Sequence, residues 1–177
     1  MQIHTDLVDA TVARLTAAGV CAGNVDKDRA EPASVDELPI AIVHVMTDKA
    51  KADGDARTGV PDFVHELALC VDIFAKGQSG AGVKSYLYAA GEAVMQALLA
   101  DQGWVGIGEG INTVEQAYLL SKEGEFTFSG LRIEFAILHR TTWPPSAANL
   151  PDFDGLTIAI ETGDGAVIGA EVELPGE

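Results

Sequence analysis

Positive charge is scarce in this chain. Its 177 residues include 11 Lys and Arg against 27 Asp and Glu, which gives a formal net charge of -16. Binding to a nucleic-acid backbone or an anionic membrane surface needs clusters of basic side chains, and a negative net field repels both surfaces. The composition therefore predicts a protein that does not read nucleic-acid sequence and does not bind membranes.

Cysteine is also scarce, and long apolar runs are missing. Cys21 and Cys70 are the two cysteines, and Cys70 lies in an alternating apolar run, which is typical of a buried free thiol. No apolar run approaches the roughly 18 residues of a membrane span. The first residues have no signal-peptide pattern. Together these features predict synthesis and folding in a reducing cytoplasm.

Hydrophobic residues make up 47% of the chain, which is enough for a well-packed domain without a disulfide or a metal. Every Lys and Arg lies at or before Arg140, and all the charged residues beyond it are acidic. We therefore expect one domain over residues 1–143. Residues 144–177 are expected to form a linker and an acidic extension.

The apolar spacing predicts two helices and several strands. Residues 2–18 form one apolar helical stripe, and a clearer one follows the glycine-rich turn at residues 77–82. Alternation predicts the strands, which cover residues 40–46, 63–74, 112–121 and 125–143, and a C-terminal hairpin of residues 156–160 and 166–174. Gly130 is predicted to form a bulge or kink. Residues 47–62 lack apolar periodicity and are predicted to be a long loop.

This order of elements predicts an α+β fold. We expect a mixed or antiparallel sheet of about four strands, with two helices packed on one face and a C-terminal β-hairpin.

The segment Gly77–Ser85 is similar to a phosphate-binding loop, because it follows a strand and opens a helix. In such a loop the lysine directly follows the last glycine, whereas here Val83 separates Gly82 from Lys84. A strand-to-helix turn is therefore favoured by roughly ten to one.

The histidines give no metal or catalytic pattern. His4, His44, His65 and His139 are scattered without ligand spacing, and each is interpreted as a surface group or a satisfied, partly buried one. His65 and Glu66 begin like a zinc-protease helix motif, but alternation would send them to opposite faces of a strand. The sequence thus predicts no catalytic, cofactor-binding or metal-binding residues and no enzyme.

Interaction residues are the remaining candidates. Lys49, Lys51 and Arg57 bring three of the eleven basic residues into the predicted loop. They are candidates for contact with an acidic partner or a neighbouring subunit, and a purely solubilising loop is about equally favoured. Trp143, before two prolines, is a candidate anchor against a partner, although packing within the chain is the commoner role.

The assembled pattern resembles the tail terminator family of long-tailed bacteriophages, the minor tail protein U type. The resemblance rests on the order of the predicted elements. These are a short N-terminal helix, a strand that starts with an acidic-Leu-Pro pattern at residues 36–43, a charged loop and a long strand at residues 65–74. An amphipathic helix follows, and then a hairpin with Gly-Glu-Phe at residues 124–126 before residues 131–138. The similarity covers about residues 1–142, and the acidic hairpin lies outside it.

The resemblance implies a structural role in a virion tail. Such proteins form hexameric rings that cap the tail tube, stop its polymerisation and present a surface for head joining. The implied partners are further copies of the chain, the tail-tube protein and head-tail connector proteins, with no cofactor. Two alternatives stay open: another neck or tail-completion factor, and a small nucleotide-binding α+β enzyme that uses the loop at residues 77–85.

Overall fold

The structure is a computed structural model. It describes residues 2–29, 31, 33–54, 62–77, 79–123, 126–142, 156–161 and 167–172. The elements in chain order are α1 (Gln2–Ala17), a 3-10 turn (Val20–Gly23), β1 (Val25–Lys27), a second 3-10 turn (Val35–Glu37), β2 (Ile40–Asp53), β3 (Asp62–Gly77), α2 (Gly80–Leu99), α3 (Gln102–Val105), β4 (Gly110–Glu123), β5 (Phe126–Thr142), β6 (Leu156–Glu161) and β7 (Val167–Val172).

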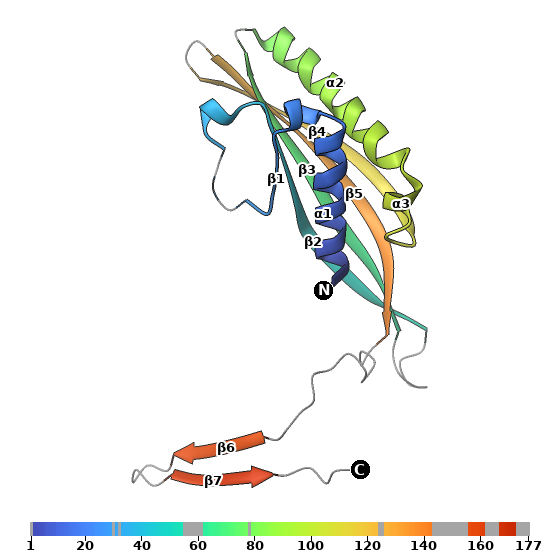
Figure 1. Cartoon of the computed structure of the whole chain (residues 1–177), viewed down its shortest axis with the longest axis vertical. Coiled ribbons are helices and arrows are strands. Elements are labelled where there is room, and N and C mark those ends of the chain that lie inside the picture. The colour runs from blue at the N-terminus through green and yellow to red at the C-terminus, as the bar shows by residue number, and fades with distance from the viewer. Residues whose placement is uncertain are drawn as a thin grey trace.

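Five of these strands form one mixed sheet in the order β1-β2-β3-β5-β4 (Figure 1). β1 is parallel to β2, and the other neighbouring strands are antiparallel. Both α1 and α2 lie on one face of the sheet, which confirms the predicted α+β fold. The sequence did not indicate β1, because three residues are too few for apolar alternation to appear.

The core lies between the two helices and the sheet. Leu67, Leu69 and Val71 alternate along β3 toward the helices and are fully buried, as predicted. Burial of one such side chain stabilises the fold by about 1.5–3 kcal/mol. α2 approaches the sheet closely at Gly91, where a Cβ would lie 2.8 Å from Leu131 Cδ2. The small residue therefore permits this close packing.

β2 is longer than the sequence predicts. The loop expected over residues 47–62 is wrong at both of its ends, because β2 continues through Asp53 and β3 begins at Asp62. Residues 55–61 of that loop lie outside the described residues. The reason for the longer β2 is backbone pairing, because residues 47–53 pair in register with residues 62–68 of β3. Backbone hydrogen bonds do not require apolar side chains, so a polar strand has no alternation that the sequence could reveal. The far ends of β2, β3 and β5 extend past the N-terminal end of α1 (Figure 1), which explains the missing apolar alternation.

The two predicted hairpins are present as the pairs β4–β5 and β6–β7. The bulge predicted at Gly130 is wrong, because β5 pairs there without interruption with both β3 and β4. A Cβ at Gly130 would lie 3.3 Å from the Phe74 ring, so this glycine leaves room for the aromatic ring. The boundary between residues 1–143 and 144–177 stays a prediction.

Within the described residues, no helix combines the length and the apolar character that crossing a membrane would require.

Candidate functional site

The predicted contact residues Lys49 and Lys51 lie in β2, on the face of the sheet opposite α1 and α2. We call this side, which also carries Ala68, Cys70 and Asp72 of β3, the far face. Both lysines are exposed, and they pair across to Glu66 and Val64 respectively. They are therefore strand residues rather than loop residues, as a consequence of the longer β2. Arg57 and Trp143 lie outside the described residues.

The sheet has two edges that could accept another strand. β1 pairs with β2 only opposite Ala41–Val43, so within the described part of the chain β2 has one strand neighbour from His44 to Asp53. β4 forms the opposite edge. A free edge presents a row of N–H and C=O groups with which a second chain can pair.

The β4 edge carries negative charge on the far face. Glu115 of β4 lies directly opposite Glu134 of β5, an arrangement of like charges that destabilises a sheet. Arg132 lies nearby on the same face, but its Nε and Nη2 atoms are each 2.7 Å from an oxygen of Asp72. Neither glutamate forms an ion pair with any described residue. Their charges are thus available to a basic partner.

Two exposed tyrosines lie beside the same edge. Tyr88 of α2 and Tyr118 of β4 contact edge to face, with ring centroids 5.0 Å apart, and they are 45% and 38% exposed. Lys84 Nζ lies 5.5 Å from the centre of the Tyr88 ring, as in a cation–π contact. Exposed tyrosines are enriched at protein interfaces, because they bury a large area with little loss of side-chain entropy.

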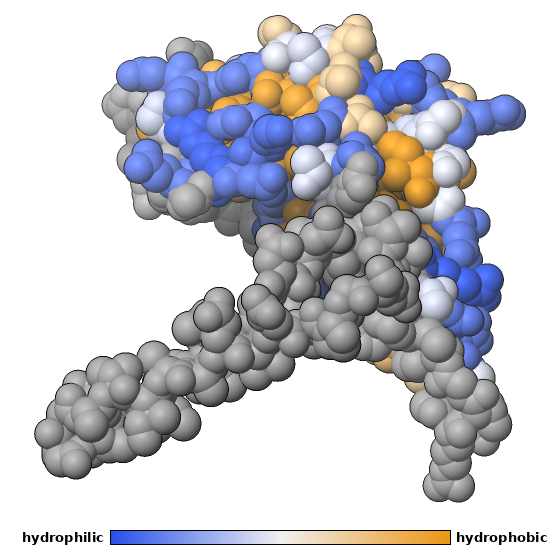
Figure 2. All heavy atoms as spheres, turned by 60° about the horizontal axis from the view of Figure 1, so that its bottom comes forward, coloured by the Kyte–Doolittle hydropathy of each residue, from blue (hydrophilic) through white to orange (hydrophobic). Residues whose placement is uncertain are grey.

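Hydrophilic residues cover most of the described surface in Figure 2, where the hydrophobic areas are small and separate. A partner that binds the surface seen in this view would therefore rely on polar contacts and charge more than on a large apolar patch.

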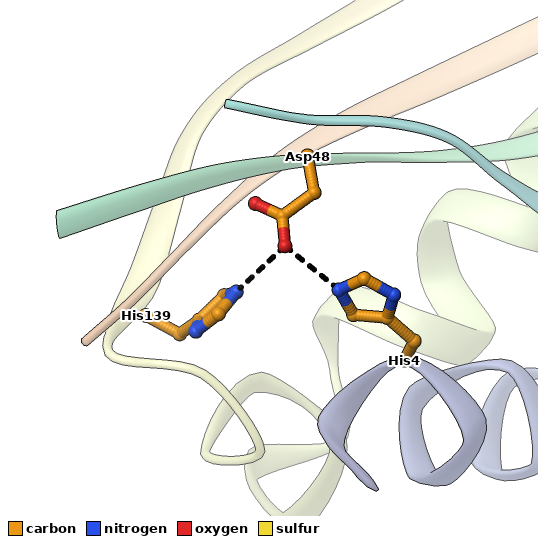
Figure 3. Close-up of side chains that lie close together, drawn as sticks. All are labelled: His4, Asp48 and His139. Carbon is orange, nitrogen blue, oxygen red and sulfur yellow. Dashed lines mark hydrogen bonds and ion pairs between the residues drawn. The ribbon is translucent and has the colours of Figure 1, made fainter. Parts of the chain in front are cut away.

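A second group of side chains lies between α1 and the sheet. His4, Asp48, His65 and His139 form this group, which we call the histidine cluster. His4 Nε2 lies 2.8 Å from Asp48 Oδ2, and His139 Nε2 lies 3.7 Å from the same oxygen (Figure 3). The other carboxylate oxygen, Oδ1, lies 3.0 Å from His65 Nδ1. Asp48 is thus surrounded by three imidazoles.

The strands position the histidine cluster through one irregularity. β2 has a bulge at Met46, between Val45 and Thr47. The extra residue changes the alternation, so Asp48 shares a face with Val45 and points toward the helices. His65 and His139 are direct cross-strand neighbours in β3 and β5. Their rings stack with centroids 4.4 Å apart and planes 16° apart.

Burial and hydrogen bonding set the charge states in the cluster. Burial opposes ionisation of Asp48, but hydrogen bonds from His4 and His65 outweigh it and lower the pKa of this carboxyl. Burial lowers the pKa of His139, and the charge of His65 adds to the effect. His139 is only 5% exposed, and its Nε2 atom has no hydrogen-bond partner among the described residues.

Sequence reasoning did not find this cluster. Its members come from α1, β2, β3 and β5, so their spacing in the chain contains no ligand pattern. The bulge at Met46 also has no sequence signature, and without it Asp48 would point to the far face. One signal was available: His65 falls on the same alternating face as Leu67 and Leu69.

The segment Gly77–Ser85 forms the predicted strand-to-helix junction between β3 and α2. Ser79 caps α2, with its side chain accepting a hydrogen bond from the Gly82 backbone N–H. Val83 is buried in the core. The glycines and the serine thus have a structural role at the start of α2.

No protein-family model matches the chain, and no curated protein matches it. Among solved structures, the chain is similar to one in the virion of a native gene transfer agent particle, at 14% sequence identity and a TM-score of 0.41. The similarity covers 76% of this chain and 97% of that chain. It is too distant to assign a shared fold or function.

Proposed function

We propose that the protein is a structural component of a phage-like virion, without enzymatic activity, that assembles through the edges of its sheet. In this proposal the protein has the same role as the tail terminators that its sequence resembles. Copies of the chain form a hexameric ring, as in that family, and the ring caps the tail tube and presents a surface to the connector proteins. The observation that carries the proposal is that, in the described part of the chain, the sheet has two unpaired edges. Exposed Lys49 and Lys51 lie at the β2 edge, and Glu115 lies at the β4 edge.

The proposed interface joins the β2 edge of one subunit to the β4 edge of the next. Lys49 and Lys51 would then face the unpaired charges of Glu115 and Glu134 on the neighbouring copy. Main-chain pairing would add affinity, and Tyr88 would supply buried aromatic area. Because the two edges are different surfaces, the contact is heterologous, and it produces a closed ring when the rotation between subunits closes.

Two further features fit an assembled tail ring. The net charge of -16 would give an acidic channel that repels passing DNA. Arg57 and Trp143 remain candidates for contact with the tail-tube protein or the connector, and residues 144–177 remain a candidate extension outside the ring-forming domain.

Charge reversal tests the proposed interface. We expect sedimentation velocity of the wild-type protein to show a closed oligomer, and the double variant Lys49→Glu/Lys51→Glu to sediment as smaller species. Adding Glu115→Lys to that variant should restore part of the oligomer, because the charges again differ in sign. The double variant Arg14→Glu/Lys76→Glu changes the net charge equally at positions in α1 and near the end of β3, outside both proposed edges, and should leave the oligomer intact.

Three outcomes would contradict this interface. The first is a wild-type protein that stays monomeric both alone and with purified tail-tube protein. The second is equal loss of oligomer in the control variant. The third is large, irregular aggregation of Lys49→Glu/Lys51→Glu, which would indicate that the lysines protect the edge from uncontrolled pairing instead. Failure to stop tube growth by a protein that does form rings would exclude the terminator role but keep the interface.

A further inference from the structure

Three potential metal ligands converge in the histidine cluster. His4 Nε2, Asp48 Oδ2 and His139 Nε2 all lie within 4.8 Å of one another. Zinc binds imidazole nitrogen and carboxylate oxygen at about 2.0–2.2 Å, which places tetrahedral ligand atoms about 3.3 Å apart. The observed separations from Asp48 Oδ2, 2.8 Å to His4 and 3.7 Å to His139, bracket this value. Two of the three separations are therefore already close to that of a tetrahedral zinc site.

His139 gives an independent indication of a ligand. Its Nε2 atom is buried and points toward Asp48, and in the part of the chain that the structure describes it has no hydrogen-bond partner. A buried polar atom without a partner is costly and rare in folded proteins. The 3.7 Å to Asp48 Oδ2 is too long for a hydrogen bond. A cation between these two atoms would satisfy both.

His65 and Thr141 provide the outer support that metal sites need. His65 Nδ1 lies 3.0 Å from Asp48 Oδ1, and its Nε2 atom lies 2.7 Å from the Thr141 hydroxyl oxygen. Its ring also stacks on His139. These contacts fix the orientation of one ligand carboxylate and one ligand imidazole, as outer hydrogen bonds do in known metal sites.

Charge and access also favour a cation. Within the described residues, Asp48 forms ion pairs with histidines but with no Lys or Arg. The side chains of His4 and Asp48 are 31% and 20% exposed, which leaves a path for an ion and a position for a water ligand. Two imidazoles and one carboxylate suit zinc and similar transition metals, whereas magnesium and calcium prefer oxygen ligands.

We propose that His4, Asp48 and His139 bind one zinc-class transition-metal ion, with His65 as a positioning residue. The ion joins α1 to β2 and β5, so its role is structural: it fixes the N-terminal helix on the sheet. The site lies within one chain, so it does not depend on the proposed ring.

Metal titration of the untagged, EDTA-treated full chain tests this site. We expect one zinc ion per chain by elemental analysis after dialysis, and a melting temperature about 5–10 °C higher when zinc chloride is present at 100 times its dissociation constant. Magnesium chloride at the same concentration should give no shift. Cobalt(II) should produce a visible absorption spectrum of nitrogen and oxygen ligation, without the charge-transfer band of a thiolate ligand.

The variants assign the ligands. His4→Gln changes a partly exposed side chain, so it should keep the fold while losing the zinc-dependent shift and the cobalt spectrum. Asp48→Asn should behave in the same way. The matched control is His44→Gln, because His44 lies on the far face, 4.0 Å from Asp72, and this variant should bind zinc like the wild type. No zinc-dependent shift in the wild type, a thiolate spectrum, or equal loss in His44→Gln would overturn the proposal.

Discussion

Two aspartates on opposite faces of the sheet have histidine neighbours, but their surroundings differ in one respect. Asp72 on the far face is held by the guanidinium of Arg132 at 2.7 Å through both oxygens, and His44 lies 4.0 Å away. Asp48 on the helix face is surrounded by the imidazoles of the histidine cluster. A guanidinium is permanently charged, whereas a neutral imidazole gives a hydrogen bond without a charge.

This difference shows why similar residue types have different roles on the two faces. The fixed cation already neutralises Asp72, so an added metal would have to compete with Arg132. Asp48 has no such competitor among the described residues, and the buried His139 leaves a ligand atom unused. Both aspartates have histidine neighbours, so histidine alone does not distinguish the two sites. What distinguishes a structural ion pair from a potential metal site is whether a permanently charged group already neutralises the carboxylate.

We expect the largest difference in stability between a charged substitution on the core side of the sheet and one on the far face. Leu69→Asp places an unpaired charge at a fully buried position, and we expect a loss of about 4 kcal/mol or more, enough to unfold most of the protein. Thr47→Asp, at an exposed far-face position, should change the stability by less than about 0.5 kcal/mol. Urea unfolding followed by circular dichroism measures both. A cooperatively folded Leu69→Asp protein would contradict the assigned faces.

A smaller difference in stability is expected when the contacts of Asp72 and Asp48 are removed in turn. Arg132→Met leaves Asp72, which is 8% exposed, without its cation, and we expect a loss of about 2 kcal/mol in the free energy of unfolding. Adding Asp72→Asn should recover part of this loss, because the unpaired charge is then removed. Asp48→Asn in metal-free protein removes a carboxylate that holds no fixed cation and should cost about 1 kcal/mol or less. Equal losses for Arg132→Met and Asp48→Asn would remove the distinction between the faces.

The sequence predicts most of this fold because the core is strongly patterned. The alternation along β3 and the spacing of four and then three residues between Val83, Leu87 and Ala90 in α2 indicate burial on one side, and both are confirmed. The end of β2 could not be predicted in this way. Residues 47–53 are stabilised as a strand by backbone pairing with β3, and polar side chains on both faces carry no periodic signal.

The histidine cluster is less predictable than the fold, for two reasons. His4 and His139 are brought together by tertiary packing, and sequence spacing reports only local neighbours. Asp48 faces them because of the bulge at Met46, and a change of one residue in register moves a side chain to the other face. Sequence spacing is equally limited for Lys49 and Lys51. Their exposure could be predicted, but their position at the edge of a strand could not.

An effect that appears only at alkaline pH concerns the thiol of Cys70 on the far face. Burial raises the pKa of Cys70 from 9.0 to about 11, and the nearby charge of Glu134 adds to this effect. The folded chain therefore keeps the proton at a pH at which the unfolded chain releases it. Stability is fully present below about pH 9 and falls as the pH rises toward 11, by at most about 1.4 kcal/mol per pH unit. Urea midpoints at pH 7.5, 9 and 10 should decrease less steeply for Cys70→Ala than for the wild type. An unchanged slope would show that this buried thiol does not set the alkaline limit of the fold.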